Sequence, residues 1–184
     1  MIKFKDILEE AKYDYGCVML YADFPKEILN LQLQIDTEDL YVADNNGGYG
    51  LEDEAHCTIL YGLHETVSLK DVLRIMRKYK FTALKADGPT LFENPLFDVL
   101  KYDVNYPTRG GAFLHKAHEE LASTLPNTQT YPDYHPHMTI AYLKPGLGNK
   151  YVELFRENNA SSFIVTPKFG VFSEASGNKE QFDI

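Results

Sequence analysis

The chain of 184 residues has the length and composition of one globular domain with an acidic charge balance. Hydrophobic residues make up 44% and charged residues 24%, which excludes a largely disordered chain, and no apolar run reaches the roughly 20 residues that a membrane helix needs. Lys and Arg total 18 against 27 Asp and Glu, so the net charge is −9. Because proteins hold long nucleic acids mainly through Lys and Arg, this balance disfavours a long RNA or DNA partner and favours a small anionic one.

The N-terminus and the cysteines indicate a cytoplasmic protein. The sequence MIKFKDILEE has acidic residues where a secretory signal would have its apolar segment. The two cysteines, Cys17 and Cys57, are too few for a disulfide framework, so we expect a reducing compartment. One bridge between them stays open as an alternative.

Hydrophobic periodicity predicts alternating helices and strands without a linker, and therefore a single domain over 1–184. In the first half, the predicted elements are a helix over 2–12, a strand over 16–22, a helix that Pro25 opens and that reaches Ile35, a loop over 44–50, a strand over 55–63 and a helix from Ser68 to Tyr79. In the second half, they are several strands over 80–104, a helix over 112–123, a strand over 137–143, a helix over 149–158, and closing strands at 164–165, 169–172 and 181–184. This order predicts an α+β domain with a mostly antiparallel sheet backed by helices.

One six-residue phrase occurs twice. Residues 56–61 read His-Cys-Thr-Ile-Leu-Tyr and residues 137–142 read His-Met-Thr-Ile-Ala-Tyr, so four of six positions match in a chain with only 6 histidines. Both copies fall in predicted strands. The flanking sequences do not repeat, which favours two equivalent strands over a repeat protein.

Strand geometry gives this phrase a chemical meaning, because side chains alternate between the two faces of a strand. His56 and Thr58 therefore share one face, and His137 and Thr139 do the same in the second copy. The alternation places the intervening residues in the core, Tyr61 and Tyr142 included. If the two strands lie side by side in one sheet, two imidazoles and two hydroxyls converge on one site.

Two facing histidines suit phosphodiester chemistry without a metal. A neutral imidazole takes the proton of the attacking hydroxyl, and an imidazolium protonates the leaving oxygen. The hydroxyls of Thr58 and Thr139 can hold the non-bridging phosphate oxygens. An isolated His-x-Thr in a strand is usually a packing or surface pair, but its duplication favours the catalytic interpretation.

These paired H-x-T motifs, about eighty residues apart, resemble those of the 2H phosphoesterase superfamily, the LigT-like enzymes. The resemblance implies a bilobal α+β fold with mostly antiparallel sheets, a central cleft and no cofactor or metal. It implies that His56 and His137 are the acid and base, and that Thr58 and Thr139 bind phosphate. It also implies a small nucleotide substrate, with a cyclic oligonucleotide immune messenger and a phage counter-defence role in the host cytoplasm as the leading hypothesis.

Five further residues are candidates for substrate binding. Tyr15 and Tyr134 lie near strand ends where a base could stack, and Glu174 follows a closing strand. Arg109 precedes a predicted helix, and Lys144 follows the second motif, so either side chain could meet a phosphate. A zinc site at His115 and His118 is disfavoured, because two histidines three apart in a helix usually form a solvated face.

Two alternatives stay open. Within the phosphodiesterase class, the chain could process RNA 2′,3′-cyclic phosphate ends or 2′-5′ linkages. Outside that class, it could bind a cyclic nucleotide without turnover, as a sponge or regulatory module.

Overall fold

The computed structural model describes residues 15–42, 50–104, 108–129 and 133–184. The predicted helix over 2–12 and most of the glycine-rich loop over 44–50 lie outside these residues. The described elements are β1 (Gly16–Ala22), α1 (Lys26–Gln32), the short 3-10 helix η2 (Thr37–Asp39), β2 (Ala55–Leu63), α2 (Leu69–Met76), β3 (Leu84–Glu93), β4 (Asp98–Val104), α3 (Arg109–Thr124), β5 (His137–Leu143), α4 (Gly148–Glu157), β6 (Ser162–Val165), β7 (Phe169–Ser173) and β8 (Lys179–Phe182).

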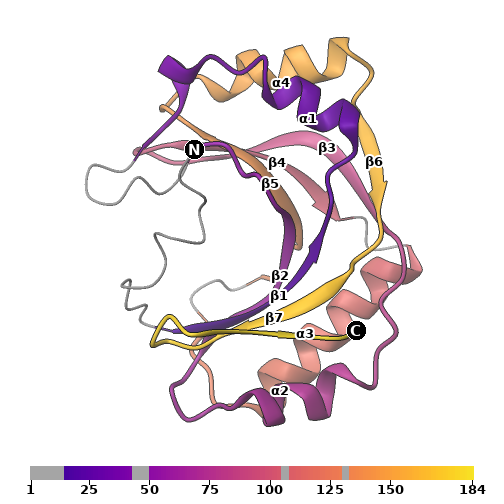
Figure 1. Ribbon diagram of the computed structural model, residues 1–184. Helices are drawn as coiled ribbons and strands as arrows, with labels where there is room; N and C mark the ends of the chain where they lie inside the picture. Colours follow the sequence, from indigo (N-terminus) through magenta and orange to yellow (C-terminus); the bar gives the residue numbers. More distant parts are fainter. Residues whose placement is uncertain (1–14, 43–49, 105–107, 130–132) are drawn as a thin grey trace.

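The strands form two four-stranded antiparallel sheets (Figure 1). The order of one is β2-β1-β7-β8, here called the β2 sheet, and the order of the other is β5-β4-β3-β6, here called the β5 sheet. Helices α1 and α4 lie over the β5 sheet and α2 and α3 lie beside the β2 sheet, at opposite ends of the view in Figure 1. The predicted α+β class with antiparallel sheets backed by helices is therefore confirmed.

The two motif strands become neighbours in a different way from the single sheet considered above. The two motif strands do not belong to one sheet, because β2 is an edge strand of the β2 sheet and β5 is an edge strand of the β5 sheet. These two edges run side by side in the centre of the molecule (Figure 1). An isolated antiparallel bridge between Leu51 and Ala141 joins them. The strands thus become neighbours through a meeting of two sheets.

Local capping signals explain where helices α2 and α3 begin. The Ser68 hydroxyl accepts a hydrogen bond from the backbone N–H of Asp71, whose carboxylate accepts one from the Ser68 backbone, a capping box at the start of α2. Thr108 caps α3 through the Gly111 N–H, so this helix begins at Arg109, three residues before the prediction. Helix α1 ends at Gln32 instead of Ile35, because the N–H groups of Gln34 and Ile35 donate to carbonyls three residues back and close tight turns that do not continue the α-helix.

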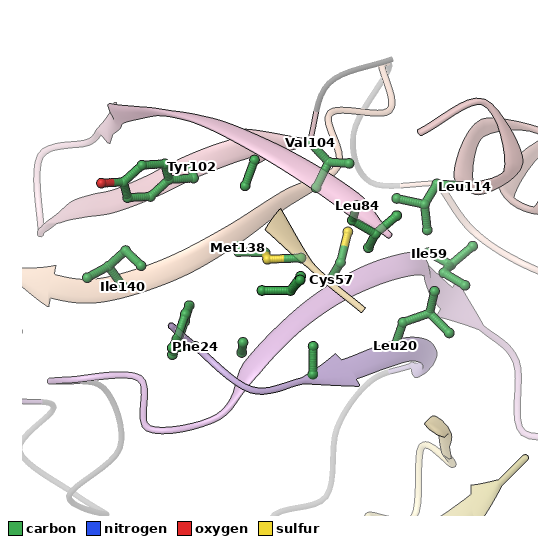
Figure 2. Close-up of a cluster of buried hydrophobic side chains, with 14 of the residues drawn as sticks. Leu20, Phe24, Cys57, Ile59, Leu84, Tyr102, Val104, Leu114, Met138 and Ile140 are labelled. Carbon is green, nitrogen blue, oxygen red and sulfur yellow. The ribbon is translucent and has the colours of Figure 1, made fainter. Parts of the chain in front are cut away.

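The hydrophobic core fills the space on the helix-covered faces of both sheets (Figure 2). Cys57 and Ile59 from β2 meet Met138 and Ile140 from β5 there, together with Leu114 from α3. All five side chains are at most 1% exposed. At roughly 25 cal/mol per Å² of apolar area, each such residue stabilises the fold by about 1.5–3 kcal/mol. The core therefore holds the two motif strands in place through the face opposite His56 and His137.

The cysteines face different sides of the β2 sheet. Cys57 points into the core, whereas Cys17 pairs in register with Tyr61 on the opposite face, and both thiols are free. Burial raises the pKa of Cys17 to about 11 and that of Cys57 to about 12. The structure therefore does not form the disulfide that the sequence left open.

Candidate active site

The two motif histidines come together because β2 and β5 run antiparallel at the line where the sheets meet. The Glu52 N–H donates to the Ile140 carbonyl at 3.0 Å, and the Tyr142 N–H donates to the Gly50 carbonyl at 2.7 Å. From this contact the segment that contains Leu51 continues to His56, and β5 runs back from Ala141 to His137 in the same direction in space. The side chains are close enough that a charge on His137 lowers the pKa of His56.

Both imidazoles are held in the same way. His56 Nδ1 lies 3.1 Å from the Glu54 carbonyl oxygen, and His137 Nδ1 lies 2.8 Å from the His135 carbonyl oxygen. In each motif the acceptor is thus the backbone two residues before the histidine. A carbonyl can only accept, so each Nδ1 carries the proton and donates it. This tautomer leaves Nε2 of both rings to exchange protons with a substrate.

Burial lowers the pKa of both histidines below the usual 6.5. For His56, the hydrogen bond to Glu54 opposes this, and the charges of His137 and Lys179 add to it. For His137, the hydrogen bond to His135 and the charge of Asp103 oppose the lowering, and Lys101 adds to it. Each ring can therefore be neutral near neutral pH, as a general base requires.

Each motif strand contains a β-bulge at the same place in the repeated phrase. In β2, Thr58 pairs with Met19 and Leu60 pairs with Val18, so Ile59 is the extra residue. In β5, Thr139 pairs with Lys101 and Ala141 pairs with Leu100, so Ile140 is the extra residue. A bulge places two consecutive side chains on one face and reverses the alternation beyond it.

The bulges overturn the prediction that Tyr61 and Tyr142 belong to the core. Because the alternation reverses, both tyrosines lie on the same face as the histidine and threonine that precede them. Tyr61 is 38% exposed, and Tyr142 is half-buried. Tyr61 packs edge-on against Tyr15, and Tyr142 packs edge-on against Phe97. We call the two faces that carry the motif side chains the motif faces.

The order of groups along the motif faces follows from the antiparallel run of β2 and β5. From one end to the other, the motif side chains come in the order Tyr142, Thr139, His137, His56, Thr58 and Tyr61. The two histidines are thus central, one threonine lies on each side of them, and an aromatic ring lies beyond each threonine. The repeated phrase builds a site with approximate twofold symmetry.

The surroundings of the two histidines are not symmetric. His56 packs against Tyr21 with ring centroids 5.4 Å apart, and Tyr21 stacks in turn on Phe169. The Glu52 carboxylate lies 3.9 Å from His56 Nδ1, and burial raises the pKa of Glu52 to about 7. The His56 side is therefore aromatic, with a carboxyl group that keeps its proton to near neutral pH.

His137, in contrast, has ionic neighbours. It packs edge-on against Phe92 at 4.9 Å, and its register partner on β4 is Asp103. Lys101, two residues before Asp103, is the register partner of Thr139 and is only 3% exposed. Among the described residues, the His137 half of the site thus holds a buried cation beside Thr139, whereas the cross-strand partner of Thr58 is the apolar Met19.

The five predicted substrate-binding residues lie in different places. Tyr15 lies on the β2 motif face, where it contacts Tyr61 and stacks on His64. The Tyr134 hydroxyl donates to the Thr58 carbonyl at 3.0 Å, and its ring stacks on His118 with centroids 4.0 Å apart. Tyr134 thus contacts β2 from the side of helix α3. Because one face of its ring stacks on His118, that face is not open to a base.

The other three meet only neighbours away from the histidines in the contacts of the described residues. The Arg109 guanidinium lies over the Phe113 ring of α3 at 5.5 Å. The Lys144 N–H donates to the Asp39 carbonyl. Glu174 begins the turn between β7 and β8, where its carboxylate accepts from the Ser176 hydroxyl at 2.8 Å. These contacts give no support to a role in substrate binding.

Sequence reasoning missed Lys101, Glu52 and Tyr61. Lys101 and Asp103 are two residues apart in a strand, so their spacing predicts that both side chains lie on one face. Nothing in the sequence, however, indicated that β4 pairs with β5. His118 was expected on a solvated helix face, whereas its Nδ1 lies 2.7 Å from the Ile59 carbonyl at the bulge.

Known structures share this architecture. Usb1 of Kluyveromyces marxianus matches over 94% of this chain and 99% of its own, with a TM-score of 0.59 and 10% identity. A second structure of that protein, with uridine monophosphate, matches with a TM-score of 0.55 and 9% identity over 95% and 100%. The MHV ns2 PDE domain matches with a TM-score of 0.51 and 18% identity over 91% and 89%. The chain has the 2H phosphoesterase fold. No family model and no curated protein matches the sequence.

Two further observations concern the described residues only. None of their helices is long and apolar enough to cross a membrane. No group of three or more His, Cys, Asp or Glu side chains among them is arranged to hold a metal ion.

Proposed function

We propose that this chain is a metal-independent phosphodiesterase that cleaves small nucleotide diesters, with cyclic oligonucleotide immune messengers as its substrates. The observation that carries the proposal is the equivalent presentation of His56 and His137 from two meeting strands. Each ring donates its Nδ1 proton to the backbone and leaves Nε2 for the substrate. That geometry matches what a paired acid and base need.

The reaction follows from these two nitrogens. Neutral Nε2 of one histidine takes the proton of the attacking 2′-hydroxyl or water as the new P–O bond forms. Imidazolium Nε2–H of the other gives its proton to the leaving oxygen as the old P–O bond breaks. The hydroxyls of Thr58 and Thr139 donate hydrogen bonds to the two non-bridging oxygens and hold the phosphorus between the rings.

The symmetry of the motif faces supports a substrate with a nucleoside on each side of the scissile phosphate. Tyr61 and Tyr142 lie at opposite ends of the histidine and threonine array, and stacking on aromatic side chains is a sequence-tolerant way to hold bases. An RNA end with a 2′,3′-cyclic phosphate has a nucleoside on one side only. The net charge of −9 adds support for a small substrate over a long polyanion.

The test is incubation of the purified chain with labelled cyclic di- and trinucleotides, 2′-5′ oligoadenylate and an RNA that ends in a 2′,3′-cyclic phosphate. EDTA is present throughout, and product is followed by chromatography. The proposal expects cleavage of cyclic oligonucleotides. Cleavage of the RNA end alone would support the RNA-processing alternative, and tight binding without any product would support the sponge.

A further inference from the structure

The acidic charge of this chain raises the question of which cation meets a bound phosphate. Lys101 on β4 is the strongest candidate among the described residues. Its side chain is 96% buried, although Lys is among the residues least often buried, and it lies on the β5 motif face as the direct register partner of Thr139. Cross-strand partners have Cβ atoms about 4.5–5.5 Å apart, so one phosphate oxygen can reach both side chains.

The surroundings of Lys101 fix its ammonium group in place. Nζ lies 2.5 Å from Asp103 Oδ1 and 3.0 Å from Thr90 Oγ1, and the Thr90 hydroxyl donates to Asp103 Oδ2 at 2.8 Å. The Phe92 ring lies beneath Nζ, with its centroid 4.0 Å away. An ammonium has three N–H donors, and these contacts use two of them.

We propose that Lys101 is a phosphate-binding residue of this active site and donates its third N–H to the non-bridging oxygen that Thr139 also holds. This inference rests on the proposed function. It adds a charge that the paired motifs do not contain, and it assigns that charge to one half of the site. The position opposite Thr58 is Met19 on β1, which is apolar, and Lys179, whose charge lowers the pKa of His56, is exposed, so the buried cation lies on the His137 side.

Burial gives this interaction its strength. A charge-assisted hydrogen bond is about twice as strong as a neutral one, and a buried ammonium is poorly screened by solvent. The ion pair with Asp103 lets the cation stay charged in a buried position. Asp103 itself is 45% exposed in its side chain, so water screens its repulsion of an incoming phosphate.

The test measures binding of inorganic phosphate by ³¹P NMR titration, with circular dichroism to verify folding. Lys101→Met keeps the length of the side chain and removes the charge, and we expect phosphate to bind about 10- to 100-fold more weakly. Lys150→Met is the matched control. Lys150 also pairs with a carboxylate, Asp39 at 2.9 Å, and lies over a tyrosine ring, but it is on α4. It should bind phosphate like the wild type.

Lys101→Arg separates phosphate binding from a loss of packing, because it keeps a positive charge beside Asp103 and Thr139. A folded Lys101→Arg should bind phosphate within about tenfold of the wild type, and its binding keeps the inference testable if the methionine variant fails to fold. A folded Lys101→Arg that loses phosphate binding, or unchanged binding in a folded Lys101→Met, would overturn the inference and leave the proposed function standing. Absence of phosphate binding by the wild type would instead count against the proposed site itself.

Discussion

Glu52 offers a stability test of the site because its carboxyl group is buried beside His56. Burial is the main cause that raises its pKa from an ordinary 4.5 to about 7, and the nearby charge of Asp53 adds to it. A carboxyl with a raised pKa favours the folded state fully below pH 4.5, where it is protonated in both states. That contribution is lost as the pH rises through 7, because the unfolded chain ionises more easily.

The magnitude follows from the size of this change. The pKa rises by about 2.5 units, each unit is worth ~1.4 kcal/mol, and the ionised carboxylate therefore destabilises the fold by about 3 kcal/mol at high pH. Glu52→Gln removes the titration while keeping the shape. We expect the variant to gain about 3 kcal/mol in free energy of unfolding over the wild type between pH 4.5 and pH 8.5.

Urea unfolding at these two pH values, followed by circular dichroism, measures the difference. Glu65→Gln, which changes an exposed glutamate, is the control and should show no such gain. Because Glu52 keeps its proton until about pH 7, it is neutral where His56 titrates, so Glu52→Gln should also retain activity below pH 6.5. An equal effect of the substitution at both pH values would refute the burial argument.

Three other predictions concern activity. The rate should depend on pH as a bell centred below 6.5, because burial lowers the pKa of both His56 and His137; a maximum at pH 8 would contradict paired imidazoles in these surroundings. Thr58→Val keeps the shape but loses a phosphate donor, and kcat should fall about 10- to 100-fold, whereas an unchanged kcat would remove this hydroxyl from the mechanism. Tyr61→Ala and Tyr142→Ala should each raise KM for a cyclic dinucleotide more than for an RNA 2′,3′-cyclic end, and equal effects on both substrates would argue against two base-binding positions.

The strands and the chemistry of the motifs could be predicted because both are local. The strands over 16–22, 55–63 and 137–143 have the predicted bounds, since compact apolar runs between glycines and prolines define them. The shared face of His56 and Thr58 also follows from simple alternation. These residues needed no knowledge of which strands are neighbours.

The bulges and the partnership of the two sheets could not be predicted in this way. A bulge exists only relative to a partner strand, and neither Ile59 nor Ile140 differs in sequence from an ordinary strand residue. The direction of Tyr61 depends on that extra residue. Lys101 also depends on tertiary structure, because its burial becomes acceptable only with Asp103 and Thr90 beside it.

The central claim is that His56 and His137 act on one phosphorus atom in one chemical step. Single-turnover rates of His56→Ala, His137→Ala and the double variant on a cyclic oligonucleotide test it most directly. We predict that each single substitution lowers the rate by roughly 10²–10⁴-fold, and that the double variant loses little more, because residues that act as a unit are not additive. A near-wild-type rate for either single variant, or losses that simply multiply in the double variant, would contradict the account.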